Sequence, residues 1–259
     1  MIRLKNDKEL DAMREAGRLA AELLRTCAKA VAPGMTTLEI DALARRTCAD
    51  LGVESAFLGY RGYPGCICIS VNEEVIHGIP GPRVINVGDV VSLDVGVRYR
   101  GWNGDNALTV MVGVSDPAVV ELVEQTEAAL AAGIAAVAPG RRLSDVSAAV
   151  EKVARAARLG VVREYVGHGI GTSLHEEPEV PNFGRPGHGP VLREGMVFCI
   201  EPMLNRGTAK VDVLADGWTV VTRDGRPAAH FEHEVAVVSG GVEILTPRDD
   251  TTGFRGRGK

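Results

Sequence analysis

The sequence predicts an α+β fold made of two related halves. The pentapeptide Ala-Val-Ala-Pro-Gly at 30–34 recurs at 136–140, and each copy lies between two helical patterns. Strand-rich segments follow each helix pair, which is typical of segregated α+β folds rather than of alternating βαβ units. A chain of 259 residues can bury one full-sized core. We therefore predict a single domain over 1–259, with halves at roughly 7–112 and 116–238 and a disordered tail at 250–259.

Capping signals predict where the helices begin and end. Asn6 with Glu9, and Thr36 with Glu39, have the spacing of capping boxes. The remaining predicted caps are Asp116 before Pro117 and Ser144 at N-termini, and Gly52 and Gly160 at C-termini.

A predicted hairpin carries two acids. Two β-rich runs joined by the turn residues at 99–101 contain Asp94 and Asp105. A loop at Tyr99-Arg100 would place the acids directly opposite each other, and a loop at Arg100-Gly101 would make them diagonal neighbours. Both registers leave the carboxylates on one face, roughly 4.5–8 Å apart. Two ionised carboxylates this close repel unless a cation lies between them, so a metal is favoured over a salt-bridged or N-capping pair of acids in a loop.

Three more potential ligands lie in patterns of buried strand. His168 stands between two glycines, and Glu201 and Glu232 follow apolar runs. Charged groups are almost never buried unless they are paired or bound to metal. Four acids and one imidazole carry more negative charge than one divalent ion balances. The set therefore predicts two divalent ions that share bridging carboxylates, and hydrolysis by a metal-bound water.

The motifs around these residues closely resemble type I methionine aminopeptidase. They occur in order along nearly the whole chain, at 71–80, 93–95 with 104–105, 167–171, 175–178, 200–203 and 231–233. The resemblance implies the pita-bread fold, in which helices lie outside a curved antiparallel sheet with two pseudo-symmetric helix-helix-β halves. The ligands would then converge from both halves on the inner face of the sheet.

The resemblance also implies a role for each ligand. Asp105 and Glu232 would bridge the two ions, Asp94 would hold one of them, and His168 and Glu201 would hold the other. A bridging water or hydroxide would be the nucleophile, and Glu201 would carry its proton to the leaving amine. The ions could be Co, Mn, Fe(II) or Zn, because carboxylate-rich sites accept all of them.

Other matching positions imply how the substrate is bound. His77 and His175 would contact the substrate amide and the oxygen that becomes negative during the reaction. An apolar pocket would hold the methionine side chain, and the positions that match its wall are Tyr60, Tyr63, Cys68 and Trp218.

Four positions depart from the family pattern. Phe57 stands where relatives often have a small residue or Cys, and Leu174 stands where they often have Phe. His230 and Glu234 flank the Glu-His pair, where Gln and Thr are common. All five ligands are retained, so the departures bear on the shape of the pocket.

These observations predict an enzyme that removes the initiator methionine from nascent proteins whose second residue is small. A prolidase-like, proline-directed hydrolase is an alternative, although such enzymes normally carry a large extra N-terminal domain. A metal-free binding protein on the same fold would have lost ligands. A type II methionine aminopeptidase is disfavoured because the segment between His175 and Glu201 is too short for the helical subdomain of that group.

Composition restricts the setting in which the protein works. The net charge of −5 and the pI near 5.7 favour neither nucleic acid nor an anionic membrane. No signal peptide or membrane span is visible, and the odd number of scattered cysteines suits reduced thiols, so we expect a cytoplasmic protein. The absence of an N-terminal extension predicts the minimal bacterial form, a monomer whose ribosome contact would use its own catalytic surface.

Overall fold

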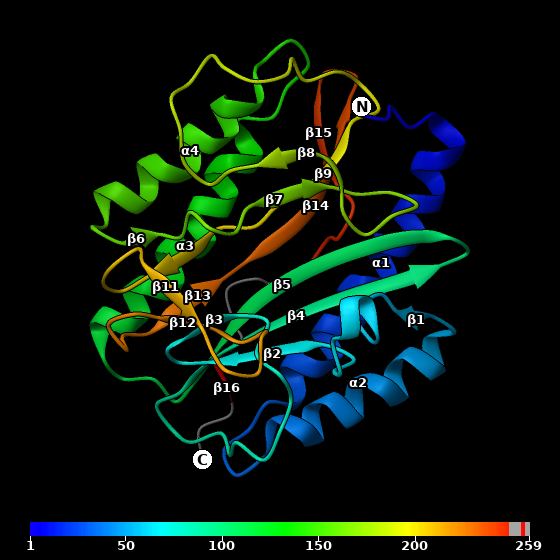
Figure 1. Ribbon diagram of the computed structural model, residues 1–259. Coiled ribbons are helices and arrows are strands. Elements are labelled where there is room, and N and C mark those ends of the chain that lie inside the picture. The colour runs from blue at the N-terminus through cyan, green and yellow to red at the C-terminus, as the bar shows by residue number, and fades with distance from the viewer. Residues whose placement is uncertain (249–254, 257–259) are drawn as a thin grey trace.

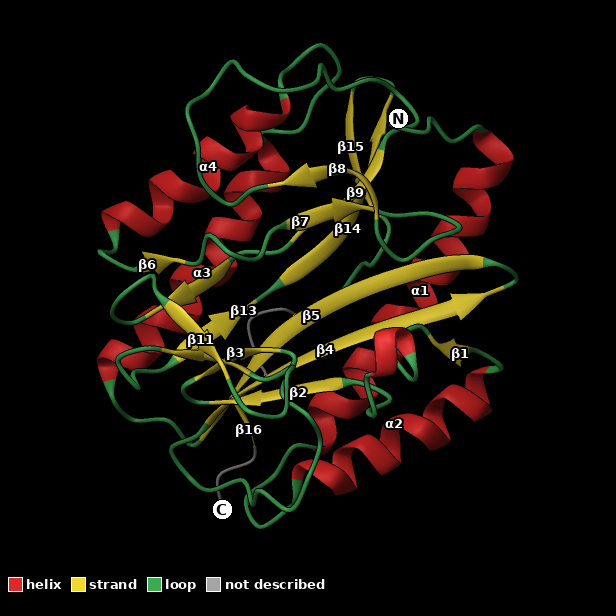
Figure 2. Ribbon diagram, in the orientation of Figure 1, coloured by secondary structure: helices red, strands yellow, loops and turns green. Residues whose placement is uncertain are grey.

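The computed structural model describes residues 1–248 and 255–256. In this part of the chain each half opens with two helices that the repeated pentapeptide connects. They are α1 (Asp7–Ala30) and α2 (Thr37–Leu51), then α3 (Pro117–Ala135) and α4 (Leu143–Ala156). The helices lie on the outside of the strands, α1 and α2 beside the first half and α3 and α4 beside the second (Figures 1 and 2).

Within the described residues, one ten-stranded sheet joins the two halves. The pairing of β5 with β14 connects them, with Glu232 opposite Ala107. The strands in spatial order are β1 (Glu54–Ser55), β4 (Val90–Tyr99), β5 (Trp102–Val112), β14 (Glu232–Val238), β9 (Val197–Ile200), β7 (Gly167–Gly169) and β8 (Glu176–Val180). Three more strands pair at its margins, β2 (Cys68–Val71) on β4, β15 (Gly241–Ile244) on β14 and β16 (Arg255–Gly256) on β5.

Two smaller sheets and one short helix complete the fold. One sheet contains β13 (Ala228–His230), β10 (Met203–Asn205) and β6 (Gly160–Val161). The other contains β11 (Val211–Val213), β12 (Val220–Thr222) and β3 (Glu74–Ile76). The 3₁₀ helix η1 (Tyr60–Gly62) lies between β1 and β2 in the chain.

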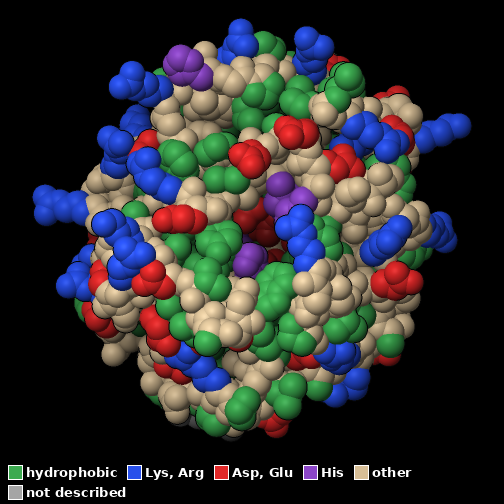
Figure 3. All heavy atoms as spheres, viewed as in Figure 1, with side chains coloured by type: hydrophobic (Ala, Val, Ile, Leu, Met, Phe, Trp, Pro, Cys, Tyr) green, Lys and Arg blue, Asp and Glu red, His purple; other side chains and the backbone are tan. Residues whose placement is uncertain are grey.

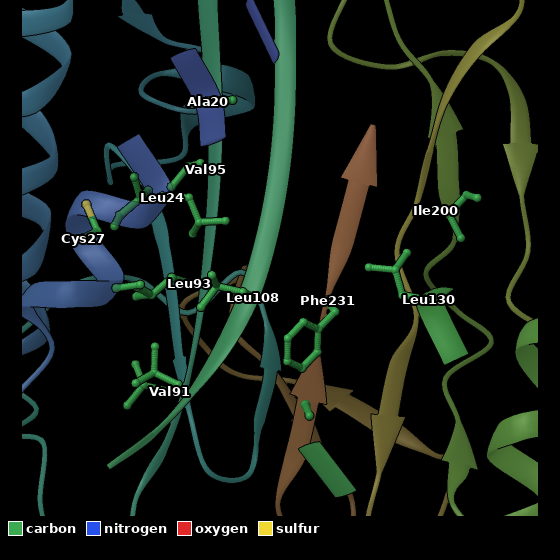
Figure 4. Close-up of a cluster of buried hydrophobic side chains, with 14 of the residues drawn as sticks. Ala20, Leu24, Cys27, Val91, Leu93, Val95, Leu108, Leu130, Ile200 and Phe231 are labelled. Carbon is green, nitrogen blue, oxygen red and sulfur yellow. The ribbon is translucent and has the colours of Figure 1, made fainter. Parts of the chain in front are cut away.

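Strand alternation separates an apolar face from a polar one. Leu93 and Val95 of β4 are buried in one core with Leu24 of α1, as Figure 4 shows. The same core continues into the second half, where Leu130 of α3 and Ile200 of β9 belong to it. Residues between these positions on the strands face the other way, so the inner face of the sheet is free to carry acids.

The predicted capping boxes of the first half are confirmed. The Asn6 side chain accepts from the amide of Glu9, and the Thr36 hydroxyl accepts from Glu39. Gly52 ends α2 in the left-handed conformation at φ 67°, as predicted.

The caps of α4 differ from the prediction. Ser144 is not the N-cap, because the Asp145 carboxylate accepts from the amide of Arg142 and the helix begins earlier, at Leu143. The Ser144 hydroxyl accepts from the amide of His188 instead. Gly160 is not the C-cap either, because Ala157 ends the helix and Gly160 begins β6. The Asp116 N-cap of α3 is confirmed.

The β4–β5 hairpin takes the second of the two predicted registers. Tyr99 pairs with Trp102, so the loop is Arg100-Gly101, and both of its residues have positive φ, at 49° and 85°. This conformation matches the twist of the strands. Asp94 therefore faces Ala107 and is the diagonal neighbour of Asp105.

Three further predictions concern the chain as a whole. All five cysteines are free and buried, in agreement with the expected reduced thiols. In the described part of the chain, no helix combines the length and apolar character that a membrane crossing requires. The tail predicted to be disordered lies outside the described residues except for β16.

Candidate metal centre

The five predicted ligands gather on the inner face of the large sheet. Asp94 and Asp105 come from the β4–β5 hairpin, and the other three come from β7, the end of β9 and the start of β14. The Nε2 atom of His168 lies 3.7 Å from Oδ2 of Asp105 and 3.6 Å from Oε1 of Glu201. Ligand atoms of Asp105, His168 and Glu232 lie within 4.8 Å of one another. Two halves of the chain thus supply one compact group of donors.

Several carboxyl oxygens in this group have no hydrogen-bond partner. They are buried atoms, namely Oδ1 of Asp94, Oδ1 of Asp105 and Oε1 of Glu232. A buried carboxylate oxygen without a donor is costly unless a cation satisfies it. The oxygen-rich set with one imidazole suits divalent ions of the Mn, Fe(II), Co or Zn kind. The residues present therefore fit a divalent metal.

Burial is the main cause that raises the pKa values of the four acids. Burial raises the pKa of Asp105 to about 7. Burial, followed by repulsion from neighbouring carboxylates, raises the pKa of Asp94, Glu201 and Glu232 well above the usual range. A cation among them would favour the ionised forms and reverse these shifts.

His168 is prepared to act as a ligand. Its Nδ1 atom lies 3.0 Å from the carbonyl oxygen of Gly169, so we assign the ring proton to Nδ1. Burial lowers the pKa of His168 to about 3. The imidazole is therefore neutral, with the lone pair of Nε2 directed at Asp105 and Glu201.

Sequence reasoning missed one member of the group. Cys199 has its Sγ atom within the same 4.8 Å as the donors of Asp105, His168 and Glu232. One signal in the sequence was available. Cys199 is two residues before Glu201, and residues two apart in an extended segment face the same side. The apolar run 197–200 concealed that signal, because a cysteine there resembles an ordinary core residue.

The two candidate catalytic histidines lie beside the centre. The His175 ring has its centroid 4.2 Å from that of His168, and its Nδ1 atom lies 2.9 Å from the hydroxyl of Tyr60. His77 makes edge contacts with Tyr165 and with Trp218. Burial lowers the pKa of His77 to about 4 and also lowers that of His175. Both rings are therefore neutral near pH 7.

An apolar cluster adjoins the histidines. Tyr63 packs edge-on against Trp218, with ring centroids 5.1 Å apart, and its hydroxyl donates to the carbonyl of Gly78. The predicted wall residues Tyr60, Tyr63, Cys68 and Trp218 all belong to this cluster, together with Phe57 and Leu174. Figure 3 shows a hollow in this face, with histidines at its edge and acidic atoms at its bottom.

The four departures from the family pattern lie close to this site. A Cβ atom at Gly96 would overlap the ring of Phe57, so the absence of a side chain on β4 makes room for the large aromatic. His230 directs Nε2 at Glu201, 3.9 Å from Oε2, without a hydrogen-bond partner. The buried Glu234 accepts from the amide of Asp105 at 3.3 Å.

Comparison with known proteins identifies the family. The profile of metallopeptidase family M24 matches residues 11–239. The chain belongs to metallopeptidase family M24. It is 47% identical over 246 residues to methionine aminopeptidase 1 of Bacillus subtilis. The matched region covers 95% of this chain and 99% of that protein. It is 49% identical to methionine aminopeptidase 1 of Mycobacterium tuberculosis over 92% of each chain. The resemblance predicted from the motifs is confirmed.

Solved structures of M24 members agree with the fold. Methionine aminopeptidase from Thermotoga maritima superposes with a TM-score of 0.94 at 45% identity, over 96% of this chain and all of that one. The predicted pita-bread fold is confirmed. The prolidase from Pyrococcus furiosus has a TM-score of 0.77 at 21% identity, over 95% of this chain and 66% of that chain, which shows the shared fold alone.

Proposed function

We propose that this protein is a two-metal aminopeptidase that removes the N-terminal methionine from polypeptides whose second residue is small. The observation that carries the proposal is the similarity to methionine aminopeptidases along nearly the whole chain. The cluster of Asp105, His168 and Glu232, three of the five expected ligands, supports it. Asp105 and Glu232 would hold both ions, with Asp94 on one side and His168 and Glu201 on the other. Bound divalent ions would supply an activated water and polarise the scissile carbonyl.

Tyr60 sets the hydrogen-bonding state of His175. If the tyrosine hydroxyl donates to Nδ1 across their 2.9 Å contact, the ring proton must lie on Nε2. A neutral His175 then offers one N–H donor toward the substrate oxygen that gains negative charge. His77, also neutral, has φ 59° and packs edge-on against Trp218 of the apolar cluster, where its ring would contact the substrate amide. Preorganised donors of this kind usually contribute two to three powers of ten in rate.

Glu201 is the group best placed to move a proton. Its two oxygens face different imidazoles, Oε1 toward His168 and Oε2 toward His230. With cations bound nearby, the Glu201 carboxylate would be ionised, so it could accept a proton from water and return it to the leaving amine. The amide side chain of Asn182 donates to the backbone carbonyl of Glu201 and fixes that turn of chain.

The apolar cluster supports selection for methionine. Aromatic edges at Tyr63 and Trp218 suit a thioether sulfur. Compared with the common family pattern, residue 57 is larger (Phe) and residue 174 is no longer aromatic (Leu). The pocket therefore keeps aromatic character but has a different shape. We expect that outline to accept methionine and to reject branched or charged first residues.

The test is a set of peptides measured with the metal-loaded protein. Met-Ala, Met-Gly and Met-Ser peptides should be cleaved, whereas Met-Lys and Met-Leu should have a kcat/KM lower by about 10²-fold, because about 1 Å of misplacement at the carbonyl costs that much. Leu-Ala and Xaa-Pro peptides should be poor substrates. A preference for Xaa-Pro would favour a prolidase-like enzyme, and failure to cleave any peptide would favour a binding protein.

The setting of the reaction forms the last part of the proposal. We infer that the chain acts as one catalytic domain, as a monomer in the cytoplasm, on nascent chains that reach it at the ribosome. The acidic pI gives no reason to expect specific nucleic-acid binding. Sedimentation of the purified protein, alone and with ribosomes, would test the monomer and the ribosome contact together.

A further inference from the structure

Cys199 brings a sulfur atom into the candidate metal centre. It lies on β9, and its side chain is fully buried. Its Sγ atom and the donor atoms of Asp105, His168 and Glu232 all lie within 4.8 Å of one another. In a tetrahedral site with bonds of about 2.0–2.3 Å, neighbouring donors are roughly 3.5 Å apart. Small side-chain adjustments would therefore bring all four donors onto one ion.

The oxygens next to this thiol point independently to a cation. Oδ1 of Asp105 and Oε1 of Glu232 are buried atoms without a hydrogen-bond partner. The two residues are only 3% and 2% exposed, so bulk solvent does not reach these oxygens. One carboxylate oxygen of each residue lies within 4.8 Å of the Cys199 sulfur.

The chemistry of the donors determines which ions such a set would favour. Carboxylates suit Mn and other hard ions, whereas thiolates select softer ions such as zinc and its heavier relatives. Cysteine sulfur, histidine nitrogen and carboxylate oxygen are all zinc ligands, and zinc takes four ligands in a tetrahedral arrangement. The five family ligands alone contain no sulfur.

We propose that Cys199 is a metal ligand, and that the centre has a second, thiophilic ligand set made of Asp105, His168, Cys199 and Glu232. When an ion binds in this way, the S–H bond breaks, a metal–sulfur bond forms and the proton passes to solvent, with no transfer of electrons. Zn²⁺ and Cd²⁺ are then held more tightly than a carboxylate-only site would hold them. The inference rests on the metal centre of the proposed function but not on its catalytic use.

The competing role for Cys199 is that of a hydrogen-bond donor. Its S–H group can donate to the Glu232 carboxylate, and this contact opposes the rise that burial and the neighbouring acids cause in the pKa of that acid. In that role the sulfur stays protonated and only orients Glu232, and a serine or threonine would serve equally well.

Absorption spectroscopy separates the two roles without reference to catalysis. Metal-free protein is titrated with Co²⁺, and separately with Cd²⁺, under anaerobic and reducing conditions. We expect sulfur-to-metal charge-transfer absorption in the ultraviolet that saturates with the first ion bound per chain. The Cys199→Ser variant should bind metal without this absorption, and its affinity for Cd²⁺ relative to Mn²⁺ should fall by about 10-fold or more.

Control variants test whether the absorption comes from Cys199. Cys68 is the other thiol in the apolar cluster beside the centre, so Cys68→Ser should retain the absorption. If Cys199→Ser does not fold, Cys199→Thr or Cys199→Ala gives the same comparison. Circular dichroism and metal analysis accompany each variant.

Two results would overturn the proposal. Wild-type protein that contains Co²⁺ or Cd²⁺ by metal analysis but lacks charge-transfer absorption has no metal–sulfur bond. Absorption that persists in a folded Cys199 variant comes from another thiol. Peptidase activity without the absorption would reject only the sulfur ligand, whereas the absorption without any peptidase activity would reject only the proposed function.

Discussion

The two halves of the molecule contribute to one metal centre in different ways. In the first half a single hairpin carries Asp94 and Asp105, and its tight Arg100-Gly101 loop fixes their diagonal relation. In the second half His168, Glu201 and Glu232 lie on or next to three different strands that meet only when the large sheet forms. Ligands that lie close together in the chain are thus organised by a turn, and ligands far apart in the chain are organised by the whole fold.

The largest expected effect compares two candidate ligands. Asp105 of the hairpin would contact both ions, whereas His168 of the second half would contact only one. Asp105→Asn should abolish turnover and remove both ions, because it takes away a charge that serves both. His168→Ala should lose one ion per chain and keep the other. Metal analysis of the two purified variants, together with turnover of a Met-Ala peptide, checks this difference. Retention of both ions by Asp105→Asn would contradict the bridging role.

A smaller effect is expected where a residue of the second half acts on substrate without holding metal. His175→Ala should lower kcat by about 10²-fold and leave the metal content unchanged, since it removes a donor to the developing negative oxygen. His188 is an exposed histidine of the same half, and His188→Ala serves as the control with unchanged kinetics. Loss of bound metal in His175→Ala would make this residue a ligand and reject the assignment.

The smallest effect concerns His77, the candidate catalytic histidine of the first half. The unfolded chain protonates this side chain below about pH 6.5, whereas the folded chain keeps it neutral until about pH 4. Its contribution to stability is therefore complete above pH 6.5 and is lost as the pH falls toward 4.

His77→Asn removes this titration, and asparagine tolerates the positive φ of the position. The free energy of unfolding of metal-free wild-type protein, relative to the variant, should drop by about 1–3 kcal/mol between pH 7 and pH 4. Urea unfolding at several pH values measures it. A difference that does not change with pH would show that His77 titrates normally.

Local signals made much of the first half predictable from sequence. The capping boxes at Asn6 and Thr36 and the paired acids of the hairpin depend on residues a few positions apart. The same reasoning was wrong at Ser144 and Gly160 in the second half. There, the Asp145 carboxylate accepts from the amide of Arg142 at the start of the helix, the role predicted for the serine. Gly160 belongs to a strand and pairs with Asn205.

The composition of the site was predictable only in part. The four candidate acidic ligands were recognisable because acids in apolar strands are unusual, and His168 was singled out by the glycines on either side of it. Cys199 was not, because a cysteine in a buried strand is ordinary and its proximity to Asp105 depends on the neighbouring strands. The choice between the two hairpin registers also needed the structure, because Arg100 had to adopt positive φ.

The contact between Phe57 and Gly96 has a consequence for how relatives of this protein can diverge. The ring occupies the space that any side chain at position 96 would need, so residue 96 cannot gain a side chain while Phe57 is present. Lineages should therefore alter the two positions together, with a small residue at 57 wherever 96 carries a side chain. Phe57 belongs to the apolar cluster beside the centre. Family members that differ at positions 57 and 96 should therefore also differ in the inhibitors that they bind.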